Sequence, residues 1–173
     1  MRIREISTAD TAAFTECLRR TNEESGTAGQ PIDMGEVERL IKMSCKHSGK
    51  NIFVAEDDGH IVGYSCVIGG NQLSDRHKGI FRIILLSAYR GRKWGTRLTE
   101  AAVSWARKQG FRRLELSVAS NNHVAQVLYQ KCGFAVEGIK RCAFFDGKDY
   151  HDEIIMGLLF DSALDCDGAA ELQ

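Results

Sequence analysis

A basic turn at residues 89–97, which reads YRGRKWGTR, carries the clearest chemical signal in the sequence. It follows a predicted buried strand at residues 80–86, and a helix is predicted to begin inside it. The unpaired N–H groups of a first helical turn and the positive end of the helix dipole favour anions, and glycines let a ligand approach the main chain. The cations and glycines of the turn are Arg90, Gly91, Arg92, Lys93, Gly95 and Arg97. This combination predicts a polyphosphate site, although a solvated basic loop is the simpler alternative. Neither the P-loop pattern GxxxxGK(S/T) nor the dinucleotide pattern GxGxxG occurs.

A second motif, NHVAQVLYQKCGF, occupies residues 122–134, one predicted strand further along the chain. Asn122 is a typical residue for the start of a helix. Ala125, Leu128 and Cys132 then form an apolar stripe at helical spacing, and Gly133 is typical of a helix end.

The two motifs, in this order and at this spacing, resemble those of the GNAT superfamily of N-acetyltransferases. The turn fits the family pattern (Q/R)-x-x-G-x-(G/A) at Arg90 and Gly95, with Lys93 in place of the central glycine. The helix fits N-x-x-A-x-x-L-Y-x-K-x-G-F. Residues 61–64 (IVGY) resemble the third strand of the family, and residues 146–153 (DGKDYHDE) resemble its last hairpin.

The resemblance implies that acetyl-CoA is a co-substrate and that its pantetheine arm lies between the fourth and fifth strands like a short added strand. A bulge in the fourth strand would separate the two. The cofactor contacts would come from Ile83, Ile84, Leu85, Arg90, Gly91, Arg92, Lys93, Trp94, Gly95, Thr96 and Asn122. Tyr129 would direct its hydroxyl at the thioester sulfur. No metal is implied.

The implied reaction is direct attack of a primary amine on the thioester in a ternary complex. Freeing a lysine-like amine of its proton at pH 7 costs roughly 4–5 kcal/mol, and an α-amine only about 1–1.5 kcal/mol. A strand N–H group can stabilise the oxyanion that forms. Tyr129 works best as a hydrogen-bond donor to the leaving thiolate.

Four proton acceptors remain open at this stage. Some relatives carry a carboxylate at the position of Ser117 on the fifth strand. Glu115 shares its face by strand alternation and is our predicted catalytic carboxylate. Glu153, His77 and a chain of water molecules are the alternatives.

The acceptor is expected to be a small amine, an amino acid or a protein N-terminus, as in ribosomal-protein alanine N-acetyltransferases. The loop at residues 22–33 and the hairpin near residues 144–150 are the expected selectors, and Glu23 and Glu24 could attract a cationic amine. An acyl-CoA sensor that has lost turnover is the alternative function, because Lys93 and Ser117 depart from the family pattern. A homodimer through the last strands is expected by analogy.

Composition narrows the class of protein. The chain has 173 residues, with 23 Lys and Arg against 23 Asp and Glu, and this zero net charge makes nucleic-acid binding an improbable primary role. No apolar run approaches the roughly 20 residues of a membrane span. The N-terminus lacks an apolar secretory segment, and the 6 cysteines include no CxxC pair. We therefore expect a cytoplasmic protein without disulfides or membrane contact.

The order of the predicted elements indicates one α/β domain at residues 1–160, followed by an acidic and flexible tail at residues 161–173. Ser7 and Asp10 predict a helix that runs to about Thr21. Strand–helix–strand passages predict parallel crossovers within a mixed sheet. The resemblance specifies a mostly antiparallel sheet of about seven strands, split between strands 4 and 5, with about four helices.

Overall fold

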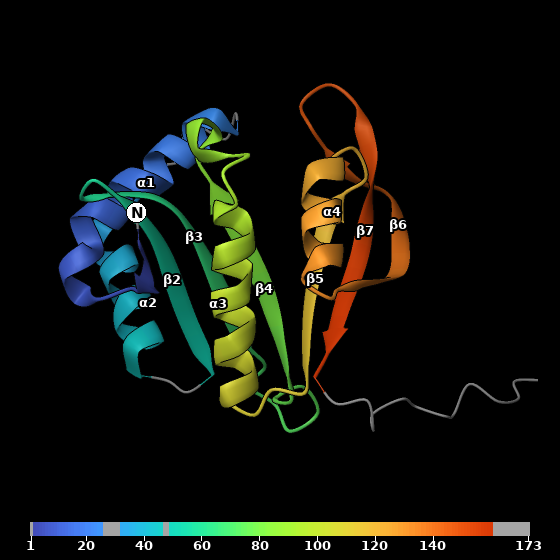
Figure 1. Ribbon diagram of the computed structural model, residues 1–173, viewed down its shortest axis with the longest axis horizontal. Coiled ribbons are helices and arrows are strands. Elements are labelled where there is room, and N and C mark those ends of the chain that lie inside the picture. Colours follow the sequence, from blue (N-terminus) through green and yellow to red (C-terminus); the bar gives the residue numbers. More distant parts are fainter. Residues whose placement is uncertain (1, 26–31, 47–48, 161–173) are drawn as a thin grey trace, which may run out of the picture.

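The structure of the chain, a computed structural model, describes residues 2–25, 32–46 and 49–160 (Figure 1). These residues form a seven-stranded sheet in the order β1-β2-β3-β4-β5-β7-β6. The strands are β1 (Arg2–Glu5), β2 (Lys50–Asp57), β3 (His60–Gly69), β4 (Lys78–Leu85), β5 (Arg113–Ala119), β6 (Ala135–Phe145) and β7 (Tyr150–Leu159). Neighbouring strands are antiparallel except β4 and β5, which are parallel. The expected mixed, mostly antiparallel sheet is confirmed, whereas the predicted tail lies outside the described residues.

Helices cover the two faces of the sheet unequally. They are α1 (Thr11–Glu24), α2 (Met34–Lys46), α3 (Trp94–Lys108) and α4 (His123–Lys131), with short 3-10 turns η1 (Thr8–Asp10) and η2 (Ser87–Tyr89). α1 and α2 pack on one face, over β2 and β3, and α3 and α4 lie on the other face (Figure 1). No described helix covers the α1–α2 side of β4–β7, and we call this side the open face.

Alternation along the strands builds two separate cores. On β2, Phe53 and Ala55 pack with α3, whereas Ile52 and Val54 pack with α1 and α2. Successive side chains of a strand point to opposite faces, so one strand serves both cores. The α3 side holds the larger core, which includes the fully buried Trp94.

The sheet splits between β4 and β5. These strands pair only from Lys78 to Ile80 on β4 and from Arg113 to Glu115 on β5. Beyond that point β4 stays with β3, and β5 stays with β7. The result is a wedge-shaped notch, open at the end of the sheet where α3 begins (Figure 1).

The notch does not arise as the sequence analysis expected. The β3–β4 register runs without a shift from Gly63 opposite Leu85 to Gly69 opposite Gly79, so no bulge in β4 opens the sheet. The two strands separate because each remains hydrogen-bonded to its own antiparallel neighbour while the pairing between them ends.

The start of the first helical segment follows its sequence signal. The Ser7 N–H donates to Asp10 Oδ2 at 2.8 Å, and Arg4 of β1 donates to the same carboxylate at 2.7 Å. α1 continues to Glu24, three residues past the predicted end. Residues 26–31 of the predicted selector loop lie outside the described residues.

Candidate active site

Main-chain groups without a strand partner line the β4 side of the notch. The Leu86 N–H donates to the Val62 carbonyl of β3 at 3.0 Å. Because peptide groups alternate in direction along a strand, those of Ile83 and Leu85 point away from β3 and into the notch. Ile84 directs its peptide groups to β3, so the main-chain contact expected of it is not available, and its side chain is exposed on the open face.

The β5 side of the notch is built in the same way. The Ser120 N–H donates to the Asp152 carbonyl of β7 at 2.8 Å, so alternation turns the peptide groups of Ser117 toward the notch. Unpaired strand edges that face each other inside a sheet can receive an extended ligand as an additional strand.

Tyr129 of α4 packs at the helical side of the notch. Its ring makes edge contacts with Phe81 of β4 at 6.2 Å and with Phe134 at 6.0 Å between centroids. The residue is 8% exposed, and burial raises the pKa of its hydroxyl to about 12. The hydroxyl therefore keeps its proton at neutral pH and can act as a hydrogen-bond donor.

The basic turn connects the notch to the N-terminus of α3. Lys93, which replaces the family glycine, is the N-cap of α3 and adopts the left-handed conformation with φ 62°, and Gly91 has φ 73°. The backbone geometry is thus formed despite the side chain. Trp94, Gly95 and Thr96 make up the first turn, whose N–H groups have no acceptor within the helix.

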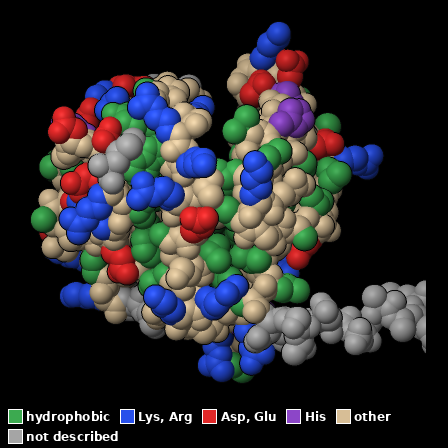
Figure 2. All heavy atoms as spheres, in the orientation of Figure 1, with side chains coloured by type: hydrophobic (Ala, Val, Ile, Leu, Met, Phe, Trp, Pro, Cys, Tyr) green, Lys and Arg blue, Asp and Glu red, His purple; other side chains and the backbone are tan. Residues whose placement is uncertain are grey.

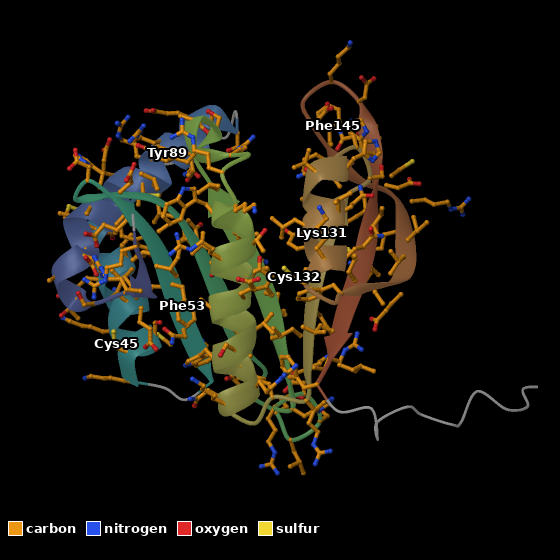
Figure 3. All side chains as sticks on the ribbon, in the orientation of Figure 1. Cys45, Phe53, Tyr89, Lys131, Cys132 and Phe145 are labelled. Atoms are coloured by element: carbon orange, nitrogen blue, oxygen red, sulfur yellow. The ribbon has the colours of Figure 1, made fainter. Side chains whose placement is uncertain are left out.

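Three cations of the turn contact neutral groups, and Arg90 also lies 3.9 Å from the Glu24 carboxylate. Arg90 Nε donates to the Leu85 carbonyl at 3.2 Å. Arg92 lies 5.9 Å from the Tyr89 ring centroid, and Arg97 lies over the ring of the buried Trp94. Figure 3 shows Tyr89 beside the start of α3 and Phe145 on the β6–β7 hairpin, at opposite rims of the open end of the notch.

Two predicted cofactor residues, Gly95 and Asn122, also stabilise the fold through helix packing and helix capping. A Cβ atom on Gly95 would lie 2.5 Å from Leu128 Cδ1 of α4, so this glycine permits close packing of α3 on α4 as well as any approach of a ligand. Asn122 caps α4, because its Oδ1 accepts a hydrogen bond from the Ala125 N–H at 3.2 Å.

Two carboxylates stand on the open face beside the notch. Glu115, at its closed end, accepts from Arg113 Nε at 2.8 Å and lies 3.6 Å from Lys78 Nζ. Partial burial raises the pKa of Glu115, but the Arg113 hydrogen bond and the Lys78 charge outweigh burial and leave the pKa lowered. Glu153 of β7 accepts from the Ser117 hydroxyl at 2.7 Å.

Glu24 does not point freely toward an incoming amine. Its two carboxylate oxygens accept from the Ser87 N–H at 2.8 Å and from the Ser87 hydroxyl at 3.0 Å, while Glu23 pairs with Arg19 within α1. The end of α1 is thereby tied to the turn that precedes Arg90. No local pattern signals this tie or the Ser117–Glu153 pair, because the partners are 63 and 36 residues apart in sequence.

The surface agrees with an anion site at the notch. Figure 2 shows a groove between the two halves of the molecule, with Lys and Arg side chains gathered over the start of α3.

A separate cavity of about 450 Å³ lies at the other end of the sheet, near Lys50, Gly69 and Gly110, and contains none of the predicted site residues. Among residues 2–25, 32–46 and 49–160, no helix is long and apolar enough to cross a membrane.

Both the sequence and the fold have counterparts among known proteins. Residues 13–134 match the sequence model of the Acetyltransferase (GNAT) family. The chain belongs to this family. Its GNAT domain is 35% identical over 103 residues to a Bacillus subtilis protein provisionally named ribosomal protein bS18-alanine N-acetyltransferase, covering 60% of this chain and 64% of that one. The chain thus spans less than two thirds of the length of this relative.

Solved GNAT structures share the fold over nearly the whole chain. A GNAT acetyltransferase from Streptococcus pneumoniae superposes with a TM-score of 0.87 at 28% identity, covering 92% of this chain and 99% of that one. A phosphinothricin acetyltransferase from Sinorhizobium meliloti, solved in complex with acetyl-CoA, has a TM-score of 0.81 at 21% identity, covering 94% and 90%.

Proposed function

We propose that this protein transfers the acetyl group of acetyl-CoA to a primary amine by direct attack in a ternary complex. The observation that carries the proposal is the continuity of two sites. A row of main-chain groups on β4 without a strand partner leads directly, through η2, to a basic helix N-terminus. An extended thioester carrier with a diphosphate has the two features that these sites recognise.

The residues of the turn and of β4 would hold the co-substrate. The N–H groups at the start of α3, with Arg90 and Arg92 beside them, would bind the diphosphate. The peptide groups of Ile83 and Leu85 would bind the pantetheine amides. Asn122, at the start of α4, is proposed to contact the same arm while it caps the helix.

The amine and the leaving thiolate are proposed to lie on opposite faces of the sheet. The amine would approach from the open face, and a β4 N–H group would stabilise the oxyanion of the tetrahedral intermediate. Tyr129, on the helical face, would donate a hydrogen bond to the departing thiolate. Glu115 is the carboxylate that the sequence analysis favoured as proton acceptor, and Glu153 is the second carboxylate on the same face beside the notch.

For the acceptor, we propose the α-amino group of a protein N-terminus that begins with alanine. The name of the Bacillus subtilis relative supports this choice. An α-amine also needs less free energy for deprotonation than a lysine-like amine, by about 3 kcal/mol. A small amine or a free amino acid is the competing acceptor class, and we place the reaction in the cytoplasm, where reduced cysteines persist.

Binding and turnover can be measured separately on the full chain. Calorimetry with acetyl-CoA should show binding at a single site, and the charge-removing variant Arg92→Ala should weaken that binding about tenfold. A matched change on α2, Arg39→Ala, should leave affinity unchanged. Thiol release should then be followed with an alanine-starting peptide, spermidine and free alanine.

Each result has a distinct meaning. Thiol release with the peptide alone supports the N-terminal acceptor, and release with spermidine or alanine alone replaces it with a small amine. Binding without release for any amine favours the sensor function, for which Lys93 and Ser117 are the departures from the family pattern. Absence of acetyl-CoA binding would overturn the whole proposal.

We further propose that two copies pair along β6. This strand is the edge of the sheet in the described part of the chain, and Ile139 and Phe145 on it are exposed apolar residues. Long, apolar sheet edges favour pairing with another strand.

A further inference from the structure

The attacking amine must lose a proton, and the groups on the open face decide where that proton goes. Of the acceptors considered from the sequence, His77 lies outside reach. It precedes β4, and its carbonyl accepts from the Arg112 N–H at 2.8 Å, at the closed end of the notch. The eight residue-to-residue steps from His77 to Leu85 span roughly 26 Å of extended chain.

Glu115 is already engaged at the closed end. Its Oε1 serves both Arg113 and Lys78, and its strand partner is Ile80, the last paired residue of β4. Two neighbouring cations favour the ionised form of a carboxylate, so Glu115 is a weak acceptor for a further proton. Glu115 also lies where β4 and β5 are still paired, and the notch opens only beyond this position.

Glu153 lies further along, where the notch is open. It stands opposite Ala119, the last residue of β5, and its Oε1 accepts the Ser117 hydroxyl at 2.7 Å. The Ser117 side chain is exposed on the open face, and its own peptide groups face the notch. A hydroxyl at the wall of the notch is thus hydrogen-bonded to a carboxylate one strand away.

The charges around this pair are few in the described part of the chain. Lys140 of β6 lies 3.5 Å from Glu153 Oε2, and β5 contributes the neutral Ser117. On β7 itself, Asp152 is turned away and accepts the Cys142 N–H at 2.9 Å. Lys140 is thus the cation that pairs with Glu153 on this face.

From this geometry we infer that Ser117 and Glu153 form the proton path for the attacking amine. The carboxylate that β5 lacks at Ser117 is supplied by the neighbouring strand β7. This inference rests on the proposed acetyl transfer and names its proton acceptor.

The proton balance of the step is simple. A proton of the bound ammonium passes to the Ser117 oxygen while the Ser117 hydroxyl proton passes to Glu153 Oε1, and the freed amine nitrogen then bonds to the acetyl carbon. Glu153 becomes a neutral carboxylic acid and then releases its proton to solvent at the exposed face. The C–S bond breaks next, and the electron pair leaves with the CoA sulfur, hydrogen-bonded to Tyr129. The extra proton on the new amide nitrogen passes to this thiolate, so the products are a neutral amide and a thiol.

The test compares isosteric variants across a pH range. Glu153→Gln keeps an oxygen that can accept the Ser117 hydroxyl, so the pair should stay folded. With saturating acetyl-CoA and an alanine-starting peptide or, failing that, whichever amine of the panel is a substrate, kcat should fall about 100-fold at pH 7. The loss should shrink toward pH 10, where the amine is free without a base. The Kd of acetyl-CoA should not change.

A relocation variant separates proton transfer from a structural role. Ser117→Glu combined with Glu153→Gln moves the carboxylate from β7 to β5 and should recover at least tenfold of the lost kcat. Glu137→Gln, which removes a carboxylate paired with Arg113 on the same face, is the control and should leave kcat unchanged.

The outcomes distinguish the inference from the proposed function. If the unmodified protein releases no thiol with any amine, acetyl transfer and this inference both fail. If it does, and Glu153→Gln retains the unmodified pH profile, the inference alone is wrong. A loss confined to Glu115→Gln would assign the proton to Glu115 instead.

Discussion

At the scale of single residues, Lys93 adopts a left-handed backbone conformation that favours glycine and adds a positive charge at the same position. A non-glycine residue in the left-handed region costs about 1–2 kcal/mol, and Lys93 has φ 62°. The strain is retained directly at the proposed diphosphate site, where the side chain adds a positive charge.

Replacing Lys93 with glycine should therefore stabilise the fold. Part of the relieved strain is offset by the greater freedom of glycine in the unfolded chain, so we expect a net gain of about 0.5–1 kcal/mol. Thermal unfolding should show Tm higher by about 1–4 °C. Lys42→Gly, within α2, is the matched control and should cost about 1 kcal/mol. A lower Tm for Lys93→Gly would show that the left-handed conformation of Lys93 does not destabilise the fold.

Tyr129 permits a second prediction at this scale. Tyr129→Phe should lower kcat about 10–100-fold with little change in the Kd of acetyl-CoA. Because burial holds the pKa of the hydroxyl near 12, the tyrosine stays protonated throughout pH 7–10, and the ratio of the two rates should be constant over that range. Steady-state thiol release checks both points. Unchanged turnover, or a ratio that varies steeply below pH 10, would remove the hydroxyl from the mechanism.

At the scale of elements, the first strand and first helix are joined by one carboxylate. Asp10 completes the capping box with Ser7 and binds Arg4 of β1. The Arg4 hydrogen bond is the main reason that the pKa of Asp10 falls to about 2, with the Ser7 hydrogen bonds adding to it against partial burial. The element order at the N-terminus thus depends on an ionised side chain.

The sign of the pH effect follows from that shift. The pKa of Asp10 is lower in the folded than in the unfolded state, so its contribution is full above about pH 4 and is lost as the pH falls through about 2. Asp10→Asn should lower the free energy of unfolding by about 1–2 kcal/mol at pH 7. Urea denaturation at pH 7 and pH 2.5 should show the difference between the two proteins shrinking in acid. An equal difference at both values would contradict it.

At the scale of the whole molecule, the sheet works as two antiparallel units, β1–β4 and β5–β7, that separate at the notch. Among the described helices, α1 and α2 cover one face of β2 and β3 and α3 covers the other, whereas β4–β7 are covered only on the side of α3 and α4. The proposed reaction uses this asymmetry, since the open face admits an amine. The same asymmetry leaves β6 as an exposed apolar edge.

The dimer proposal belongs to this scale. Sedimentation equilibrium should show a dimer at micromolar concentration, and Ile139→Lys, which places a charge on a side chain that is 61% exposed, should yield a folded monomer. Leu73→Lys, at an apolar position on the loop between β3 and β4 that is 75% exposed, is the control and should remain dimeric. A monomeric unmodified protein would refute pairing along β6.

Local patterns in the sequence were sufficient to predict the first helix, the basic turn with the helix that begins in it, and the helix that follows Asn122. The signals are short in range: Ser7 with Asp10 starts a helix, Asn122 caps another, and residues 89–97 bring cations to a helix N-terminus. The mixed sheet followed from the order of the predicted elements, and the family followed from the resemblance of the two motifs. Helix capping and amphipathic periodicity act between near neighbours, and so they are visible in one dimension.

Only the tertiary structure decided which distant groups meet. β7 lies between β5 and β6, and this placement brings Glu153 to Ser117. The tie between Glu24 and Ser87, and the packing of Leu128 against Gly95, likewise depend on how separate elements are stacked. Strand register and helix packing are set by the total burial of the folded chain, so no stretch of sequence carries them by itself.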